Sequence, residues 1–123
     1  MHATMARHQL AATPDAPARA RRLVADALGH DDEVAAAQLA VSEIVTNALR
    51  HGRARPDRRD IELRLEPRGE RLRVSVLDPG AGAALRRRPG GAGGGWGLEI
   101  VERVVHAWGH DREHGRTLVW FEV

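Results

Sequence analysis

Cysteine and lysine are both missing from this sequence of 123 residues. The absence of cysteine excludes disulfides, cysteine-ligated zinc, iron–sulfur clusters and thiol catalysis, and it favours a cytoplasmic protein. All 19 basic residues are arginine. Without lysine, a Walker A nucleotide site and a protein-kinase fold of the eukaryotic type are excluded, because both need a lysine at the phosphates.

Aromatic residues, net charge and long apolar runs are also scarce. Aromatics make up 3% of the residues and the net charge is +2, so the chain has neither the stacking platforms nor the basic excess typical of nucleic-acid binding. No apolar run approaches the roughly 18 residues of a membrane span, and residues Met1 to Leu10 contain no apolar signal region. We therefore expect a soluble cytoplasmic protein that contacts no membrane and no nucleic acid directly.

The first half of the chain predicts two helices in series. The Thr-Pro-Asp segment at 13–15 supplies an N-cap, a first-turn proline and a first-turn acid for a helix that ends at Gly29. A second helix follows, capped by Asp31 or Asp32 and ending at Gly52.

Alternating apolar and polar residues predict strands. Runs of period two at 61–66 and 71–76 flank a turn at Pro67 to Glu70, which indicates a hairpin. Residues 117–123 alternate again and are expected to form a closing strand. The short apolar segment Arg7 to Ala11 is expected to be an edge strand.

A third helix is expected from the Gly-Trp-Gly-Leu segment at 95–98 to Gly109, with its core side formed by Leu98, Val101, Val105 and Trp108. Helices packed on one side of antiparallel strands make a two-layer α+β sandwich. The chain length is that of one domain. We therefore expect a single domain over residues 1–123, with a mixed, mainly antiparallel sheet and helices on one face.

A polar row interrupts the apolar pattern of the second helix. At about 100° per residue, Glu43, Asn47 and Arg50 fall within a narrow arc opposite the apolar stripe, with His51 at its edge. A solvated helix face is the ordinary interpretation of such a row. The alternative is a functional face, because a carboxylate and an amide suit a proton acceptor and a metal ion.

Two glycine-rich segments follow the helices. Asp78-Pro-Gly-Ala-Gly82 comes directly after a predicted strand. There the aspartate can accept a hydrogen bond from an exocyclic amine, and the glycines allow the backbone to approach a flat ring. A tight turn has the same pattern. Gly93 to Leu98 opens a helix whose free N–H groups can bind phosphate; a flexible linker is the alternative. The adjacent Arg86 to Arg88 is either a solvated charge run or a clamp on terminal phosphates.

In this order, the three sites resemble the GHKL ATPase superfamily, which includes histidine kinases, gyrase-type topoisomerases and small bacterial anti-sigma factor kinases. Glu43-x-x-x-Asn47-Ala48-x-x-His51 is similar to the N box, Asp78-x-Gly80-x-Gly82 to the G1 box, and Gly95-x-Gly97-Leu98 to the G2 box. The resemblance covers nearly the whole chain, and the size resembles the stand-alone anti-sigma factor, serine-kinase type. It implies a Bergerat-type ATP-binding fold.

The resemblance also implies roles for individual residues. Glu43 would be the general base, Asn47 would coordinate Mg²⁺, and Asp78 would take the adenine amino group. The remaining positions expected to bind ATP or ADP are Arg50, His51, Gly80, Gly82, Arg88, Gly95, Gly97 and Leu98.

The implied function is an anti-sigma factor that binds ATP and Mg²⁺, sequesters a sigma factor and phosphorylates a serine or threonine of a STAS-type anti-anti-sigma partner. Residues 83–94 make a shorter ATP lid than in many relatives, and Trp96 replaces a residue that is often polar or basic. These departures favour an alternative, a module that senses ATP or ADP without phosphotransfer. The family also implies a homodimer, formed through a sheet face or through an arm at residues 1–12.

Three histidines, His106, His110 and His114, recur every four residues. Such spacing suggests a zinc site. However, Gly109 is expected to end the helix after His106, and no H-E-x-x-H motif is present. We expect no zinc here.

Overall fold

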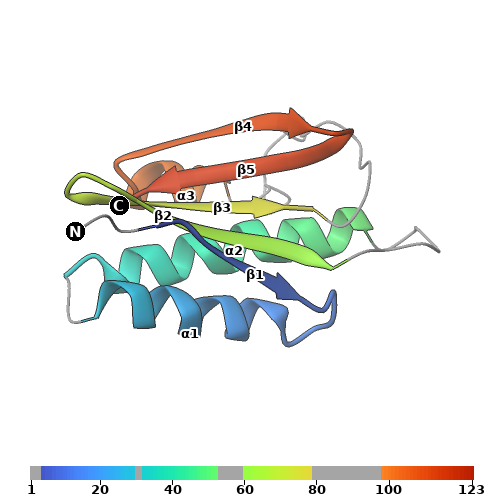
Figure 1. The fold of residues 1–123 in the computed structure, drawn as a ribbon, viewed down its shortest axis with the longest axis horizontal. Coiled ribbons are helices and arrows are strands. Elements are labelled where there is room, and N and C mark those ends of the chain that lie inside the picture. Colours follow the sequence, from blue (N-terminus) through green and yellow to red (C-terminus); the bar gives the residue numbers. More distant parts are fainter. Residues whose placement is uncertain (1–3, 30–31, 53–59, 79–97) are drawn as a thin grey trace.

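Five strands form one sheet, and two long helices cover one of its faces (Figure 1). The computed structural model describes residues 4–29, 32–52, 60–78 and 98–123. The elements, in chain order, are β1 (Ala6–Leu10), α1 (Ala16–Leu28), α2 (Val34–Gly52), β2 (Ile61–Arg68), β3 (Arg71–Leu77), α3 (Leu98–Val104), β4 (Ala107–Glu113) and β5 (Arg116–Glu122). This arrangement confirms the predicted α+β sandwich.

The strand order is β1-β2-β3-β5-β4, and all four neighbouring pairs are antiparallel. The prediction of a mixed sheet was therefore wrong for the described strands, and the edge position predicted for the first strand is confirmed. The register aligns Leu63 with Val76 and Val76 with Val119 across three strands. These side chains point to the same face, so one face of the sheet is apolar.

The first two helices begin and end close to the expected residues. Helix α1 begins at Ala16, two residues later than predicted, because Asp15 is its N-cap and Pro17 occupies its first turn. It ends at Gly29, which has a φ of 65° and donates its N–H to the carbonyl of Ala25 at 2.8 Å, as predicted. None of the described helices is long and apolar enough to cross a membrane.

The core lies between the helix layer and the apolar face of the sheet. Small residues such as Ala20 of α1 and Ala37 of α2 are fully buried, which lets the two helices approach closely. Larger side chains from the sheet, including Leu63, Val74 and Phe121, are fully buried beneath them. Each large apolar side chain buried in this way stabilises the fold by about 1.5–3 kcal/mol.

The third helix is shorter than predicted. Helix α3 ends at Val104, and residues 107–113 form strand β4 instead of continuing the helix to Gly109. Trp108 does pack against the core, as expected, but from a strand. Strand β4 pairs along its whole length with β5, so tertiary pairing overrides the helical spacing of its apolar residues.

The two hairpin turns differ in their backbone. The β2–β3 turn is tighter than predicted, because the strands extend to Arg68 and Arg71 and leave only two turn residues, of which Gly69 has a φ of 64°. The β4–β5 turn has positive φ at both His114 (51°) and Gly115 (78°), the pattern of a type I′ turn. Histidine is one of the residues that tolerates this conformation better than most.

The sheet face away from α1 and α2 carries paired charges. Arg64 of β2 donates two hydrogen bonds to the carboxylate of Glu113 on β4, at 2.7 and 2.9 Å, and it also contacts Glu62. The hydrogen bond from Arg64 lowers the pKa of Glu113. The same bond raises the pKa of Arg64 against the effect of its burial. The guanidinium therefore links the second strand of the sheet to its far edge.

An aromatic ring lies beside this ion pair. The guanidinium of Arg73 lies 4.0 Å from the centre of the Trp120 ring and is 2.8 Å from Glu122. On the neighbouring strand β4, a Cβ placed on Gly109 would lie 2.7 Å from an indole carbon of Trp120. The Trp120 ring thus covers the backbone of β4, and only glycine leaves room for it.

Candidate functional site

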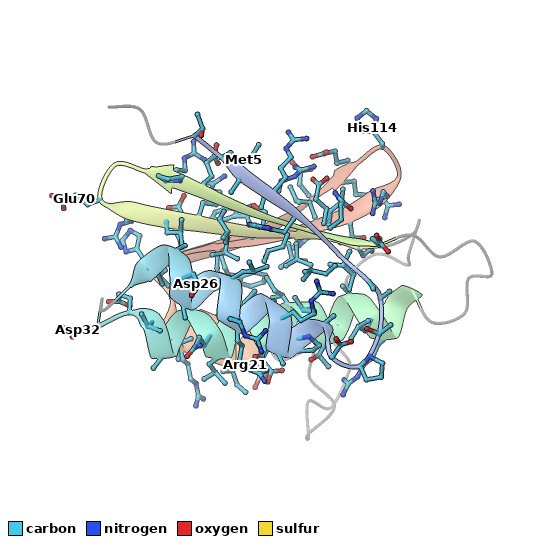
Figure 2. The ribbon with its side chains drawn as sticks, turned by 60° about the horizontal axis from the view of Figure 1, so that its bottom comes forward. Met5, Arg21, Asp26, Asp32, Glu70 and His114 are labelled. Atoms are coloured by element: carbon cyan, nitrogen blue, oxygen red, sulfur yellow. The ribbon has the colours of Figure 1, made fainter. Side chains whose placement is uncertain are left out.

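A small polar pocket lies where the C-terminal half of α2 meets the end of β3 and the start of β5. Its polar residues are Asn47, Asp78 and Thr117, and its apolar walls are Ile44, Ala48, Val76 and Val119. Figure 2 shows Glu70, the tip of the β2–β3 hairpin, at one end of the molecule and His114 toward the other end. The pocket lies near the His114 end, because β5 begins at Arg116, directly after that turn, and Thr117 lines the pocket.

Asn47 is buried, with 7% of its surface exposed. The prediction that it faces away from the core was therefore wrong. Helix α2 contacts α1, α3 and the sheet, so its buried arc is wider than an apolar stripe alone indicates. Asn47 lies at the edge of this arc, next to the buried Ile44 and Ala48, and it lines the pocket together with them.

Asp78 directly follows β3 and is only 3% exposed. Its backbone is held by β5 on both sides: its N–H donates to the carbonyl of Thr117 at 3.0 Å, and its own carbonyl accepts from Nε of Arg116 at 2.8 Å. Asp78 also lines the pocket. A carboxylate in that position can accept hydrogen bonds from a ligand, so Asp78 is a candidate for ligand recognition.

Thr117 is the site residue that the sequence analysis missed. It is buried, lines the same pocket as Asp78, and its hydroxyl has no hydrogen-bond partner among the described residues. A signal was present in the sequence. Side chains alternate between the two faces of a strand, so Thr117 lies on the same face as the buried Val119, Phe121 and Val123, and it is the one polar residue among them.

The other residues of the predicted polar row lie along α2. Glu43 is half-buried one helical turn before Asn47, and it is not one of the described residues that line the pocket. Arg50, in the last turns of the helix, is exposed. His51 belongs to the last turn of α2, and its side chain lies outside the part of the structure that is described.

Several predicted nucleotide-binding positions lie outside the described residues. They are Gly80, Gly82, Arg88, Gly95 and Gly97, together with the expected lid at 83–94. Leu98 is the first residue of α3, but its side chain is outside the description too. The structure therefore brings together Asn47, predicted to coordinate Mg²⁺, and Asp78, predicted to accept from the adenine amino group.

The three histidines do not share a helix. His110 lies in β4, His114 lies in the following turn, and His106 precedes the strand and donates its N–H to the carbonyl of Glu122. No group of three potential metal ligands occurs within the described ranges. The spacing of four residues follows from the sequence alone and does not bring the three rings together.

The pocket can recognise the edge of a flat polar ligand. The carboxylate of Asp78 can accept a hydrogen bond from an amine, and the hydroxyl of Thr117 can donate one to a ring nitrogen. The amide oxygen of Asn47 is a suitable ligand for a hard cation. The volume of the pocket among the described residues is about 10 Å³, room for about one water molecule. These residues alone can therefore contact only the edge of a ligand.

Comparisons with known proteins concern the chain as a whole. The model of the family described as histidine kinase-like ATPase domain matches residues 8–123. Comparison with curated proteins found no match, while 13 chains of solved structures match. One of them is the crystal structure of the RsbU and RsbW domains of Rv1364c from Mycobacterium tuberculosis, with 25% sequence identity and a TM-score of 0.71. The match covers 98% of the present chain and 32% of that one, so the chain spans about a third of its length.

Proposed function

Because this chain belongs to the histidine kinase-like ATPase domain family, we propose that it is an ATP- and Mg²⁺-binding anti-sigma factor kinase. It would phosphorylate a serine or threonine of a STAS-type anti-anti-sigma protein and sequester a sigma factor. The observation that carries the proposal is the pocket in which the buried Asp78 carboxylate, the Thr117 hydroxyl and the Asn47 amide lie together.

The adenine ring would enter the pocket by its amino edge. Asp78 would accept a hydrogen bond from the exocyclic amine, and the hydroxyl of Thr117 would donate to a neighbouring ring nitrogen. A hydrogen bond to a charged group contributes about 1.5–3 kcal/mol, so Asp78 would carry most of the discrimination between adenine and other bases.

The donor set fits a magnesium ion. Mg²⁺ keeps several water ligands and needs only one or two protein oxygens, and Asn47 offers one amide oxygen at the wall of the pocket. When bound, the ion would neutralise charge on the phosphates of ATP. The glycines expected to contact those phosphates lie outside the described residues and stay a prediction.

Glu43 would act one helical turn from Asn47 as the general base. It would accept the proton of a serine or threonine hydroxyl of the partner while that oxygen forms a bond to the γ-phosphorus. The bond between the γ-phosphorus and the bridging oxygen breaks, and ADP leaves. Glu43 is half-buried and not enclosed in the core, which is compatible with contact to a partner protein.

A second candidate is a nucleotide-sensing module that holds its partner without phosphotransfer. The observation that favours it is that Glu43 does not line the pocket formed by Asn47 and Asp78. In this case ATP or ADP would change partner affinity without turnover. The family also implies a homodimer, which we retain as part of the proposal.

Incubation with γ-labelled ATP, Mg²⁺ and purified STAS-domain proteins of the host would test the kinase. We expect label on a serine or threonine of one partner, and loss of that label in Glu43→Gln. The matched control is Glu70→Gln, in the exposed β2–β3 turn, which should transfer normally.

Measuring nucleotide binding and phosphotransfer together separates the two candidates. Binding of ATP with no transfer to any partner, in wild type and Glu43→Gln alike, would contradict the kinase and support the sensing module. Absence of any ATP-dependent rise in melting temperature would contradict both, because a ligand that binds the native state must stabilise it.

A further inference from the structure

Arg116, the first residue of β5, ties together the ends of two other strands. Its Nε donates to the carbonyl of Asp78 at 2.8 Å, directly after β3, and a terminal nitrogen donates to the carbonyl of Asp60 at 3.2 Å, directly before β2. Both bonds go to main-chain atoms. The side chain therefore acts on the course of the backbone at this end of the sheet.

These bonds matter most at Asp78. The N–H of Asp78 is already fixed by the carbonyl of Thr117 at 3.0 Å. With the bond from Arg116 to its carbonyl, both peptide groups around the Asp78 Cα are held by consecutive residues of β5. The direction in which the Asp78 side chain leaves the backbone is then fixed relative to Thr117 of β5, which lines the same pocket.

Precise placement affects recognition because hydrogen bonds weaken steeply when the donor angle falls below about 120°. Asp78 directly follows the last residue of β3, so the regular strand pairing with β5 ends one residue before it. The guanidinium supplies the missing support. A planar donor with several N–H groups is suited to bridge two carbonyls at once, which lysine does less well.

We propose that Arg116 is a positioning residue for base recognition, holding the Asp78 carboxylate where it meets the exocyclic amine of adenine. The inference rests on the proposed nucleotide function and adds a determinant of base specificity that does not itself touch the nucleotide. Its effect should appear only with ligands that carry the amine.

The test compares two nucleotides by calorimetry: ATP, and purine riboside triphosphate, which lacks the amino group. In Arg116→Ala we expect ATP affinity to fall by roughly tenfold, with affinity for the purine riboside nucleotide changed by less than about twofold. Arg116→Lys, which keeps one donor, should recover part of the loss. Arg112→Ala is the control, because Arg112 lies in the same hairpin and bonds the carbonyl of Gly115.

A double variant sharpens the result. In an Asp78→Ala background, Arg116→Ala should cause no further loss of ATP affinity, because the group that it positions is gone. The melting temperature of each apo variant shows whether the fold persists; if Arg116→Ala does not fold, the comparison between nucleotides is made with Arg116→Lys.

Three outcomes would overturn the inference: equal losses for both nucleotides, no loss for ATP, or the same loss in Arg112→Ala. If wild type binds ATP and Asp78→Ala does not, these outcomes remove only the role of Arg116. If wild type binds neither nucleotide, the proposed function itself fails and this inference fails with it.

Discussion

On the outer face of the sheet charged side chains bind one another, whereas on the face toward the helices the polar groups are few and gather at one end. Arg64 joins Glu62 and Glu113, and Arg73 joins Trp120 and Glu122. On the inner face, Asn47, Asp78 and Thr117 lie among apolar side chains.

The difference concerns what the polar groups stabilise. The outer charges are partly exposed and pair within the sheet, so each pair contributes modestly to stability, about 1 kcal/mol or less. The inner groups are buried and line one pocket. Three polar side chains at one end of an apolar core can bind a ligand together, and four variants test this contrast.

The largest effect is expected for Asp78→Ala. ATP affinity should fall by about 100-fold, since a charge-assisted hydrogen bond to the base is lost, and the melting temperature shows whether the variant is folded when binding is measured. Calorimetry and thermal melting measure the two quantities. Asp111→Ala, an exposed residue of β4, is the control; if Asp78→Ala bound ATP within threefold of wild type, the inner face would have no special role in binding.

Gly109→Ala tests the outer face. Its new Cβ would lie within 2.7–2.9 Å of three indole atoms of Trp120, a ring that Arg73 also contacts, so we expect a loss of about 2 kcal/mol in unfolding free energy with ATP affinity unchanged. Chemical denaturation measures it. The cost should be smaller in a Trp120→Leu background, and equal costs in both backgrounds would mean that the ring is not the obstacle.

Thr117→Val should separate binding from stability within one residue. The methyl group replaces a buried hydroxyl that has no partner among the described residues, so the melting temperature should stay the same or rise. ATP affinity should fall by about five- to tenfold through loss of one neutral hydrogen bond. A lower melting temperature with normal affinity would show that the hydroxyl serves the fold instead.

The smallest effect is expected for Glu113→Gln and depends on pH. Arg64 lowers the pKa of Glu113 below its ordinary value of 4.5, so the stabilisation is complete above that value and is lost as pH falls through the lower pKa of the folded state. The variant should be less stable than wild type by at most about 1 kcal/mol at pH 7. The gap should close as the pH falls further below 4.5, as followed by denaturation at several pH values; a gap independent of pH would exclude the ion pair as its cause.

Much of the fold could be predicted from local pattern. The period of two in β2, β3 and β5, the helical spacing of α1 and α2, and the glycine that ends α1 are all local signals. Strand β4 was missed because residues 107–113 do not alternate cleanly and His114-Gly115 is a less common turn pair than Asn-Gly. Its strand conformation comes from the hydrogen bonds of β5 along its whole length.

The candidate site was predicted in part. Asn47 and Asp78 stood out because an amide in an apolar helix and an acid after a strand are unusual types at those positions. Thr117 and Arg116 carried little local signal, since threonine is common in strands and arginine is common throughout this chain. Their importance depends on the antiparallel register that sets the start of β5 beside the end of β3.

The sequence by itself determined the types of element, the apolar faces and the presence of a carboxylate, an amide and glycine segments in a recognisable order, because these depend on residues close together in the chain. Only the tertiary structure decided that Asn47 faces inward, that Thr117 completes its pocket and that Arg116 holds Asp78. Those outcomes depend on how many neighbours surround a helix and on which residues two antiparallel strands bring side by side, and neither quantity is encoded in local spacing.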